Sequence, residues 1–145
     1  MIRPYRPEDL DAVVTVWAKA SAVAHPFFSA EFVAEEHRNI STEFLPSAET
    51  WVWQSDGQVV GFISLLGNEV GAIFVHPKFQ RVGIGRALMD HVRGLRAELE
   101  LEVFTENELG RAFYEKYGFE LMQEYVDDQT GLNVMRLRLA AMKTR

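Results

Sequence analysis

The stretch Gln80-Arg81-Val82-Gly83-Ile84-Gly85-Arg86 decides the fold of this chain, because it joins a strand pattern to a helix pattern through two glycines. An apolar run over 72–75 precedes it, and Leu88, Val92 and Leu95 follow at helical spacing. The first four amides of a helix have no internal partner and lie at its positive end. Glycines let an anionic group approach those amides closely. The stretch therefore predicts an anion site that suits a pyrophosphate.

The spacing of the glycines distinguishes three classes of phosphate-containing ligand that bind such a loop. A P-loop needs Lys-Ser/Thr after its last glycine, where this chain has Arg86-Ala87. A dinucleotide fingerprint needs a third glycine, where this chain has Leu88, and that alternative matches less well. The remaining pattern, Gln/Arg-x-x-Gly-x-Gly/Ala after a strand, resembles the acetyl-CoA loop of the GNAT (Gcn5-related N-acetyltransferase) superfamily. The matching residues are Gln80, Gly83 and Gly85.

A second motif lies downstream, over residues 107–119. GNAT proteins carry a similar run, in which an Asn opens a helix, a Tyr lies near its middle and Gly-Phe closes it. Here these residues are Asn107, Tyr114 and Gly118-Phe119. Both motifs occur in the family's order and at its usual separation, and the resemblance covers about residues 1–139. The chain is identified as a GNAT member of the small bacterial type, with one domain over 1–145.

The fold class follows from periodicity and from the resemblance together. Periodicity alone predicts an α/β or α+β domain with one sheet and four helices. The resemblance implies a mixed sheet of about seven strands that splays between its fourth and fifth strands, with acetyl-CoA in the gap. The expected strands are 2–5, 50–54, 59–66, 69–75, 98–105, 119–126 and 134–139. The expected helices start at Pro7 and Ser29 and span 85–96 and 109–117, and 140–145 is expected to be a frayed tail.

Composition narrows the partners. The 145 residues are 48% hydrophobic and 25% charged, which is ordinary for a globular domain. The absence of cysteine excludes disulfides and thiolate metal sites. A net charge of -6 argues against nucleic acid and anionic membranes and favours a cationic acceptor. No apolar run is long enough to span a bilayer, and Met1-Ile2-Arg3-Pro4 lacks a signal-peptide core, so we expect a cytoplasmic protein.

The resemblance assigns the cofactor residues. Loop amides cradle the pyrophosphate, and Arg81 and Arg86 add charge beside it. Backbone groups of Phe74 and Val75 pair with pantetheine, and one amide there faces the thioester oxygen. Asn107 caps its helix and touches the pantetheine arm. The complete set implied for acetyl-CoA is Phe74, Val75, Gln80, Arg81, Val82, Gly83, Ile84, Gly85, Arg86, Asn107 and Tyr114.

Tyr114 stands at the family's general-acid position. A phenol has a pKa near ~10, so it is protonated at neutral pH and can give its proton to a leaving thiolate. Tyr117 lies three residues further on and is the alternative, although we expect it to serve in packing.

Two residues compete for the role of general base. Glu69 lies eleven residues before Gln80, an offset at which some GNAT proteins carry a catalytic Glu, and period two places it on one strand face with Ile73 and Val75. His25 lies between the first two helices, in a segment that borders the acceptor pocket in GNAT proteins, and imidazole titrates near ~6.5. Water is the remaining alternative, and Glu69 is preferred.

Aromatic residues are expected to wall the acceptor pocket, and no metal is expected. The aromatic candidates are Phe27, Phe28, Trp51 and Trp53. No pair of histidines has metal-ligand spacing.

The predicted function is acetyl-CoA-dependent N-acetyl transfer to a primary amine, of a small molecule or of a peptide or protein, by direct attack in a ternary complex. A non-catalytic acyl-CoA-binding regulatory GNAT domain is the alternative. Tyr114 argues against it, because binding alone needs no acid. The acceptor stays open, as does assembly into a homodimer.

Overall fold

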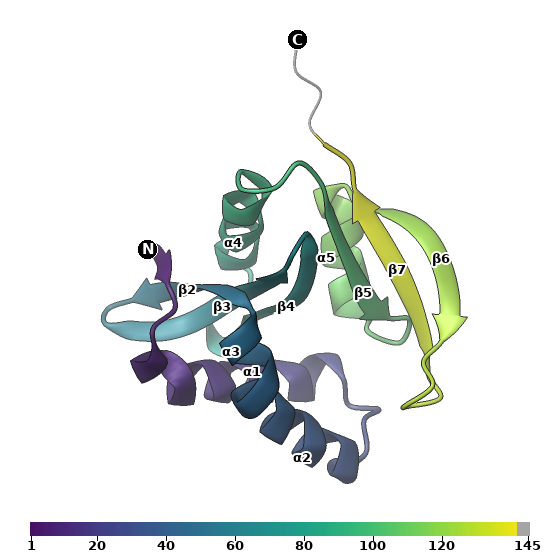
Figure 1. Cartoon of the computed structure of the whole chain (residues 1–145), viewed down its shortest axis with the longest axis horizontal. Coiled ribbons are helices and arrows are strands. Elements are labelled where there is room, and N and C mark those ends of the chain that lie inside the picture. The colour runs from purple at the N-terminus through teal and green to yellow at the C-terminus, as the bar shows by residue number, and fades with distance from the viewer. Residues whose placement is uncertain (142–145) are drawn as a thin grey trace.

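A seven-stranded mixed sheet forms the centre of the computed structural model, which describes residues 1–141 (Figure 1). The spatial order is β1-β2-β3-β4-β5-β7-β6, and every neighbouring pair is antiparallel except β4 and β5. The strands are β1 (Ile2–Pro4), β2 (Glu49–Ser55), β3 (Gln58–Leu66), β4 (Glu69–Val75), β5 (Leu99–Phe104), β6 (Glu120–Val126) and β7 (Asn133–Leu139). Residues 142–145 of the expected tail lie outside the described part of the chain.

Four longer helices occur among the described residues, as expected: α1 (Leu10–Ala24), α2 (Ala30–Asn39), α4 (Ile84–Arg93) and α5 (Glu108–Tyr117). Short helical segments are η1 (Pro7–Asp9), η2 (Ile40–Phe44), α3 (Leu45–Ser47) and η3 (Pro77–Phe79). The Ser29 hydroxyl accepts a bond from the Phe32 amide at 3.1 Å and caps α2. The expected order of strands and helices is confirmed.

The helices cover both faces of the sheet (Figure 1). On one face, α1 buries Val13 and Trp17 in a cluster with Phe62. On the other face, α4 buries Leu88 in a cluster with the next residue of β3, Ile63. Neighbouring residues of β3 thus point into different clusters, which is the alternation of a strand buried on both sides.

The sheet splays between β4 and β5. These strands are joined at one register position, where Glu69 faces Glu100, whereas β5 and β7 stay paired from Leu99 to Phe104. The carboxyl-terminal half of β4 therefore has no strand partner on its β5 side. The splay that the resemblance implied is confirmed.

A β-bulge in β4 reverses the expected face of Glu69. Ser64 pairs with Ala72 and Leu65 with Val70, so Gly71 is the extra residue. Val70 consequently packs in the cluster under α4 and α5, and the side chain of its neighbour Glu69 lies on the opposite face. The predicted common face of Glu69 with Ile73 and Val75 is wrong, because these two residues pack against the α4 and α5 cluster.

The helix after the glycine loop is shorter than expected. It ends at Arg93 and not at residue 96, and Gly94 is its C-cap, with the Gly94 amide donating to the Asp90 carbonyl at 3.2 Å. Leu95, which helical spacing placed on the buried face, is 43% exposed.

Candidate active site

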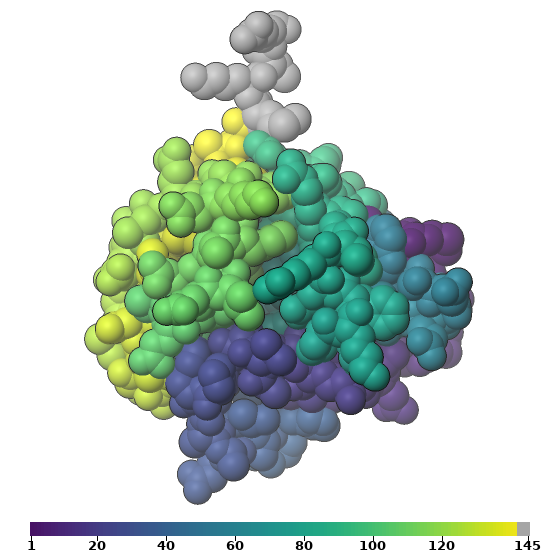
Figure 2. Space-filling model, turned by 180° about the vertical axis from the view of Figure 1, so that it is seen from behind, coloured from purple at the N-terminus to yellow at the C-terminus, as the bar shows by residue number. Residues whose placement is uncertain are grey.

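A cavity of about 850 Å³ occupies the splay and extends across both faces of the sheet. Seen from behind, the surfaces of α4 (teal), α5 (green) and the end of α1 (purple) meet at this region (Figure 2). Its walls come from α1, α2, β4, β5, the glycine loop, α4, α5 and the β6–β7 turn. The predicted site residues that line it are His25, Phe74, Val75, Gln80, Arg81, Gly83, Ile84, Gly85, Arg86, Asn107 and Tyr114.

The glycine loop brings left-handed backbone to the cavity wall. Gly83 caps α4 in the left-handed region at φ 91°, and Arg81 is left-handed at φ 67°. A Cβ on Gly83 would stand in open space, which leaves room for a ligand beside the first amides of α4. The Ile84 side chain is buried in the core, and Val82, which is 72% exposed, is not among the residues that line the cavity.

Gln80 braces the loop against β4. Its side-chain nitrogen donates to the Val75 carbonyl at 2.9 Å. The Val75 side chain packs toward α4 and α5, whereas the Phe74 side chain packs toward α1. The structure thus gives Gln80 a clear local function, to hold the loop at the end of the strand.

The two tyrosines of α5 have different surroundings. The Tyr114 ring packs between Phe113 and Phe119, and burial raises the pKa of its phenol. No hydrogen bond to the Tyr114 hydroxyl occurs within residues 1–141. The Tyr117 hydroxyl instead donates to Asp90 at 2.5 Å. Burial, together with this hydrogen bond, raises the pKa of Tyr117 to about 12. Of the two phenols, Tyr114 is the one without a protein acceptor for its proton.

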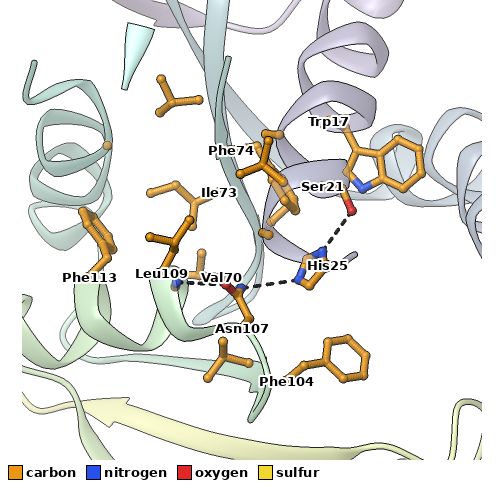
Figure 3. A pocket seen from close by; sticks show the side chains of 18 of the residues that line it. Trp17, Ser21, His25, Val70, Ile73, Phe74, Phe104, Asn107, Leu109 and Phe113 are labelled. Carbon is orange, nitrogen blue, oxygen red and sulfur yellow. Dashed lines mark hydrogen bonds between the residues drawn. The ribbon is translucent and has the colours of Figure 1, made fainter. Parts of the chain in front are cut away.

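His25 and Asn107 meet at the cavity wall (Figure 3). The imidazole Nδ1 lies 2.9 Å from the Ser21 hydroxyl, and Nε2 lies 3.4 Å from the Asn107 side-chain nitrogen. Burial lowers the pKa of His25 to about 4, so the ring is neutral at cellular pH. Asn107 also caps α5, because its side-chain oxygen accepts a bond from the Gly110 amide at 2.9 Å.

Glu69 lies outside the cavity wall. Its carboxylate pairs with Arg136 at 3.2 Å, and Arg136 also contacts Glu100 at 2.9 Å and Glu102 at 3.9 Å. The other residues named for the acceptor pocket divide: Phe28 lines the cavity, while Trp51 and Trp53 pack in the cluster with α4.

The acceptor half of the cavity contains residues that sequence analysis did not single out for the site. Phe28 packs against Phe32 and Phe104, with ring centroids 4.6 and 5.0 Å apart. The carboxylates of Glu36 and Glu102 line the same half, and burial is the largest cause that raises the pKa of each. Two weak signals in the sequence point to these residues. Glu36 is a polar residue at an otherwise apolar position of the helical pattern, and Phe104 is the last residue of its strand.

The described residues contain no group of three His, Asp or Glu side chains that could hold a metal ion. Within residues 1–141, every helix is too short or too polar to cross a membrane.

Comparisons with known proteins give the family. The family model described as "Acetyltransferase (GNAT) domain" matches residues 46–121. The peptidyl-lysine N-acetyltransferase YiaC of Escherichia coli is 35% identical over 91% of this chain and 91% of its own length. The peptidyl-lysine N-acetyltransferase YjaB of Escherichia coli is 34% identical over 96% of this chain and 95% of its own. The apo solution structure of YjaB superposes with a TM-score of 0.86, at 32% identity, and covers 97% of this chain and 98% of that one.

The fold, with its sheet splayed between β4 and β5, is that of a class of acetyl-transfer enzymes. The chain belongs to the GNAT family of acetyltransferases. It is an N-acetyltransferase, an enzyme that moves an acetyl group to an amine.

Proposed function

We propose that this enzyme uses acetyl-CoA as its donor and the side chain of a peptide or protein lysine as its acceptor. The observation that carries the proposal is the division of one cavity into two chemically different halves. The glycine loop and the cations Arg81, Arg86 and Lys116 line one half, and aromatic rings with the carboxylate residues Glu36, Glu102 and Asp127 line the other.

The donor half suits a pyrophosphate. The first amides of α4 and the open space at Gly83 suit an anion, and Arg86 lies in the first turn of the same helix. A Thermoplasma acidophilum PaiA N-acetyltransferase of the same fold was solved in complex with coenzyme A, at 21% identity and a TM-score of 0.77. The proposed pyrophosphate site is the loop around Gly83 and Gly85, which Gln80 holds against β4.

The acceptor half suits a lysine. An aliphatic stem packs well on the rings of Phe28, Phe32 and Phe104, and an ammonium group is attracted both to ring faces and to the carboxylates of Glu36 and Glu102. Both curated relatives described above carry the name peptidyl-lysine N-acetyltransferase.

The reaction proceeds by direct transfer. The neutral amine bonds to the carbonyl carbon of the acetyl donor, and the carbon–sulfur bond breaks. Tyr114 donates its phenolic proton to the leaving sulfur, because the raised pKa keeps this phenol protonated and no group within residues 1–141 accepts a hydrogen bond from it. The new amide nitrogen gives up one proton to solvent, and solvent returns one proton to the Tyr114 phenolate. A backbone amide at the end of β4 is the proposed donor to the carbonyl oxygen.

The test pairs a phenol deletion with a matched control. Wild type is incubated with acetyl-CoA and a panel of lysine peptides, and acetylated product is read by mass spectrometry. Tyr114→Phe should keep acetyl-CoA affinity and lose kcat by about 10²-fold, the usual weight of a general acid. Tyr117→Phe should keep kcat within about threefold, because its proton is already given to Asp90. Failure of wild type to bind acetyl-CoA at millimolar concentration, or to acetylate any peptide, would overturn the proposal.

A further inference from the structure

The His25 side chain occupies a junction between the acceptor wall and the helix that carries Tyr114. His25 follows the last residue of α1, and its ring stacks on Phe28 with centroids 4.6 Å apart and planes at 20°. The edge of Phe104 on β5 lies 5.7 Å away. Across the cavity wall, the ring reaches Asn107 at the start of α5, 82 residues later in the chain (Figure 3).

The hydrogen bonds determine where the imidazole carries its proton. The Asn107 oxygen is used by the Gly110 amide, so the amide nitrogen faces His25. An amide nitrogen donates only, and Nε2 must therefore offer a lone pair. The proton of the neutral ring is then on Nδ1, which donates to the Ser21 hydroxyl at 2.9 Å. Both ring nitrogens are engaged, and no lone pair is left for an amine.

An independent observation shows how closely Asn107 is fitted. A Cβ added to Gly110 would fall 2.5 Å from the Asn107 side-chain nitrogen and 2.9 Å from its Cγ. Any side chain at Gly110 would therefore displace the Asn107 amide from its present position. The amide is held on one side by His25 and has room on the other side only because residue 110 is glycine.

We propose that His25 is a positioning residue for acetyl transfer, which fixes the Asn107 amide so that its second N–H faces the donor half of the cavity. The proposal rests on the proposed function, because that N–H then serves the acetyl donor. The Asn107 amide sets the tautomer, Ser21 accepts the hydrogen bond from Nδ1, and His25 in turn orients Asn107, which begins the helix that carries Tyr114. Loss of the link should weaken binding of the donor and should leave the pH profile unchanged, whereas loss of a base would remove an acidic limb.

Two isosteric variants separate the roles. In His25→Gln, the side-chain oxygen takes the place of Nε2 and can still accept from Asn107, whereas His25→Asn reaches only the place of Nδ1. We expect His25→Gln to stay within about threefold of wild type, and His25→Asn to raise the KM for acetyl-CoA about fivefold to tenfold, the equivalent of one hydrogen bond. Gly110→Ala should raise the same KM, although alanine favours a helix over glycine. If both His25 variants lose kcat equally and also lose an acidic limb of the pH profile, the positioning role is refuted.

A measurement without substrate separates failure of this inference from failure of the proposed function. Nitrogen-15 NMR of histidine-labelled wild type should show His25 with a protonated Nδ1 and an unprotonated Nε2 at pH 7. The reverse tautomer, or a charged ring, would overturn the inference even in an active enzyme. If wild type neither binds nor uses acetyl-CoA, the proposed function fails, and the tautomer still reports on the link between His25 and Asn107.

Discussion

The buried imidazole of His25 should make the fold sensitive to mild acid. Burial lowers the pKa of His25 from 6.5 to about 4 in the folded chain. Between these two values the unfolded chain binds a proton that the folded chain does not, so stability falls as pH falls. Above pH 6.5 both states are neutral and the effect vanishes. The window for this effect is therefore pH 6.5 down to about 4.

The magnitude follows from linkage. With these two pKa values, moving from pH 7 to pH 5 should remove about 2 kcal/mol of unfolding free energy through His25 alone. The ring is only partly buried and faces the cavity, so water will screen part of the effect, and we expect a loss of about 1–2 kcal/mol. His25→Gln carries no titratable group at this position and should not show this loss.

The assay is urea unfolding of wild type and His25→Gln at pH 7, 6 and 5. The relevant quantity is the change of each protein with pH, because any packing defect of the variant is present at every pH and cancels. His37→Gln is the matched control, since His37 lies exposed on α2, and its curve should run parallel to that of wild type. Parallel curves for wild type and His25→Gln would refute the reasoning, because His25 would then titrate alike in both states.

Three further substitutions test the site. Gly83→Ala should raise the KM for acetyl-CoA about tenfold by straining the left-handed cap of α4, while Gly57→Ala, with a similar φ of 79° in a distant hairpin, should lose similar stability with KM unchanged. Glu36→Gln should raise the KM of a lysine peptide about threefold to tenfold, and the exposed neighbour variant Glu35→Gln should not; equal effects would remove Glu36 from the acceptor half. Glu69→Gln should change kcat/KM less than about threefold, because its carboxylate is ion-paired outside the cavity wall; a loss at low pH that recovers at high pH would restore Glu69 as the base.

The parts of the fold that sequence predicted well are those set by local chemistry. Ser29 caps its helix through its own hydroxyl, and Asn107 does the same for α5, so each start could be read from a few neighbouring residues. The glycine loop is equally local, since Gly83 is needed for a left-handed turn. The splay between the fourth and fifth strands came from the family resemblance, because periodicity does not specify which strands pair.

The errors and omissions arose where distant segments meet. The strand alternation placed Glu69 on the wrong face because of the bulge at Gly71, which depends on how β3 pairs with β4. A distant segment also constrains this position, since a Cβ at Gly71 would lie 2.8 Å from the Phe44 ring. The link from His25 to Asn107 spans 82 residues, and neither residue's surroundings predict it. The same is true of Glu36 and Glu102, which approach the cavity from a helix and a strand on different sides.

The structure also constrains how the acceptor loses its proton. A general base needs a free lone pair within reach of the amine. His25 has both nitrogens engaged with Ser21 and Asn107, and Glu69 is paired with Arg136 outside the cavity wall. Glu36 and Glu102 do line the acceptor half, but carboxylates beside a lysine favour its charged form and so raise its pKa. The same groups that attract the acceptor thus hold its proton, and release to solvent should become easier as pH rises toward the pKa of the bound amine. The enzyme should therefore gain kcat/KM steadily above neutral pH, with the midpoint of the rise set by the acceptor amine and not by a residue of the chain.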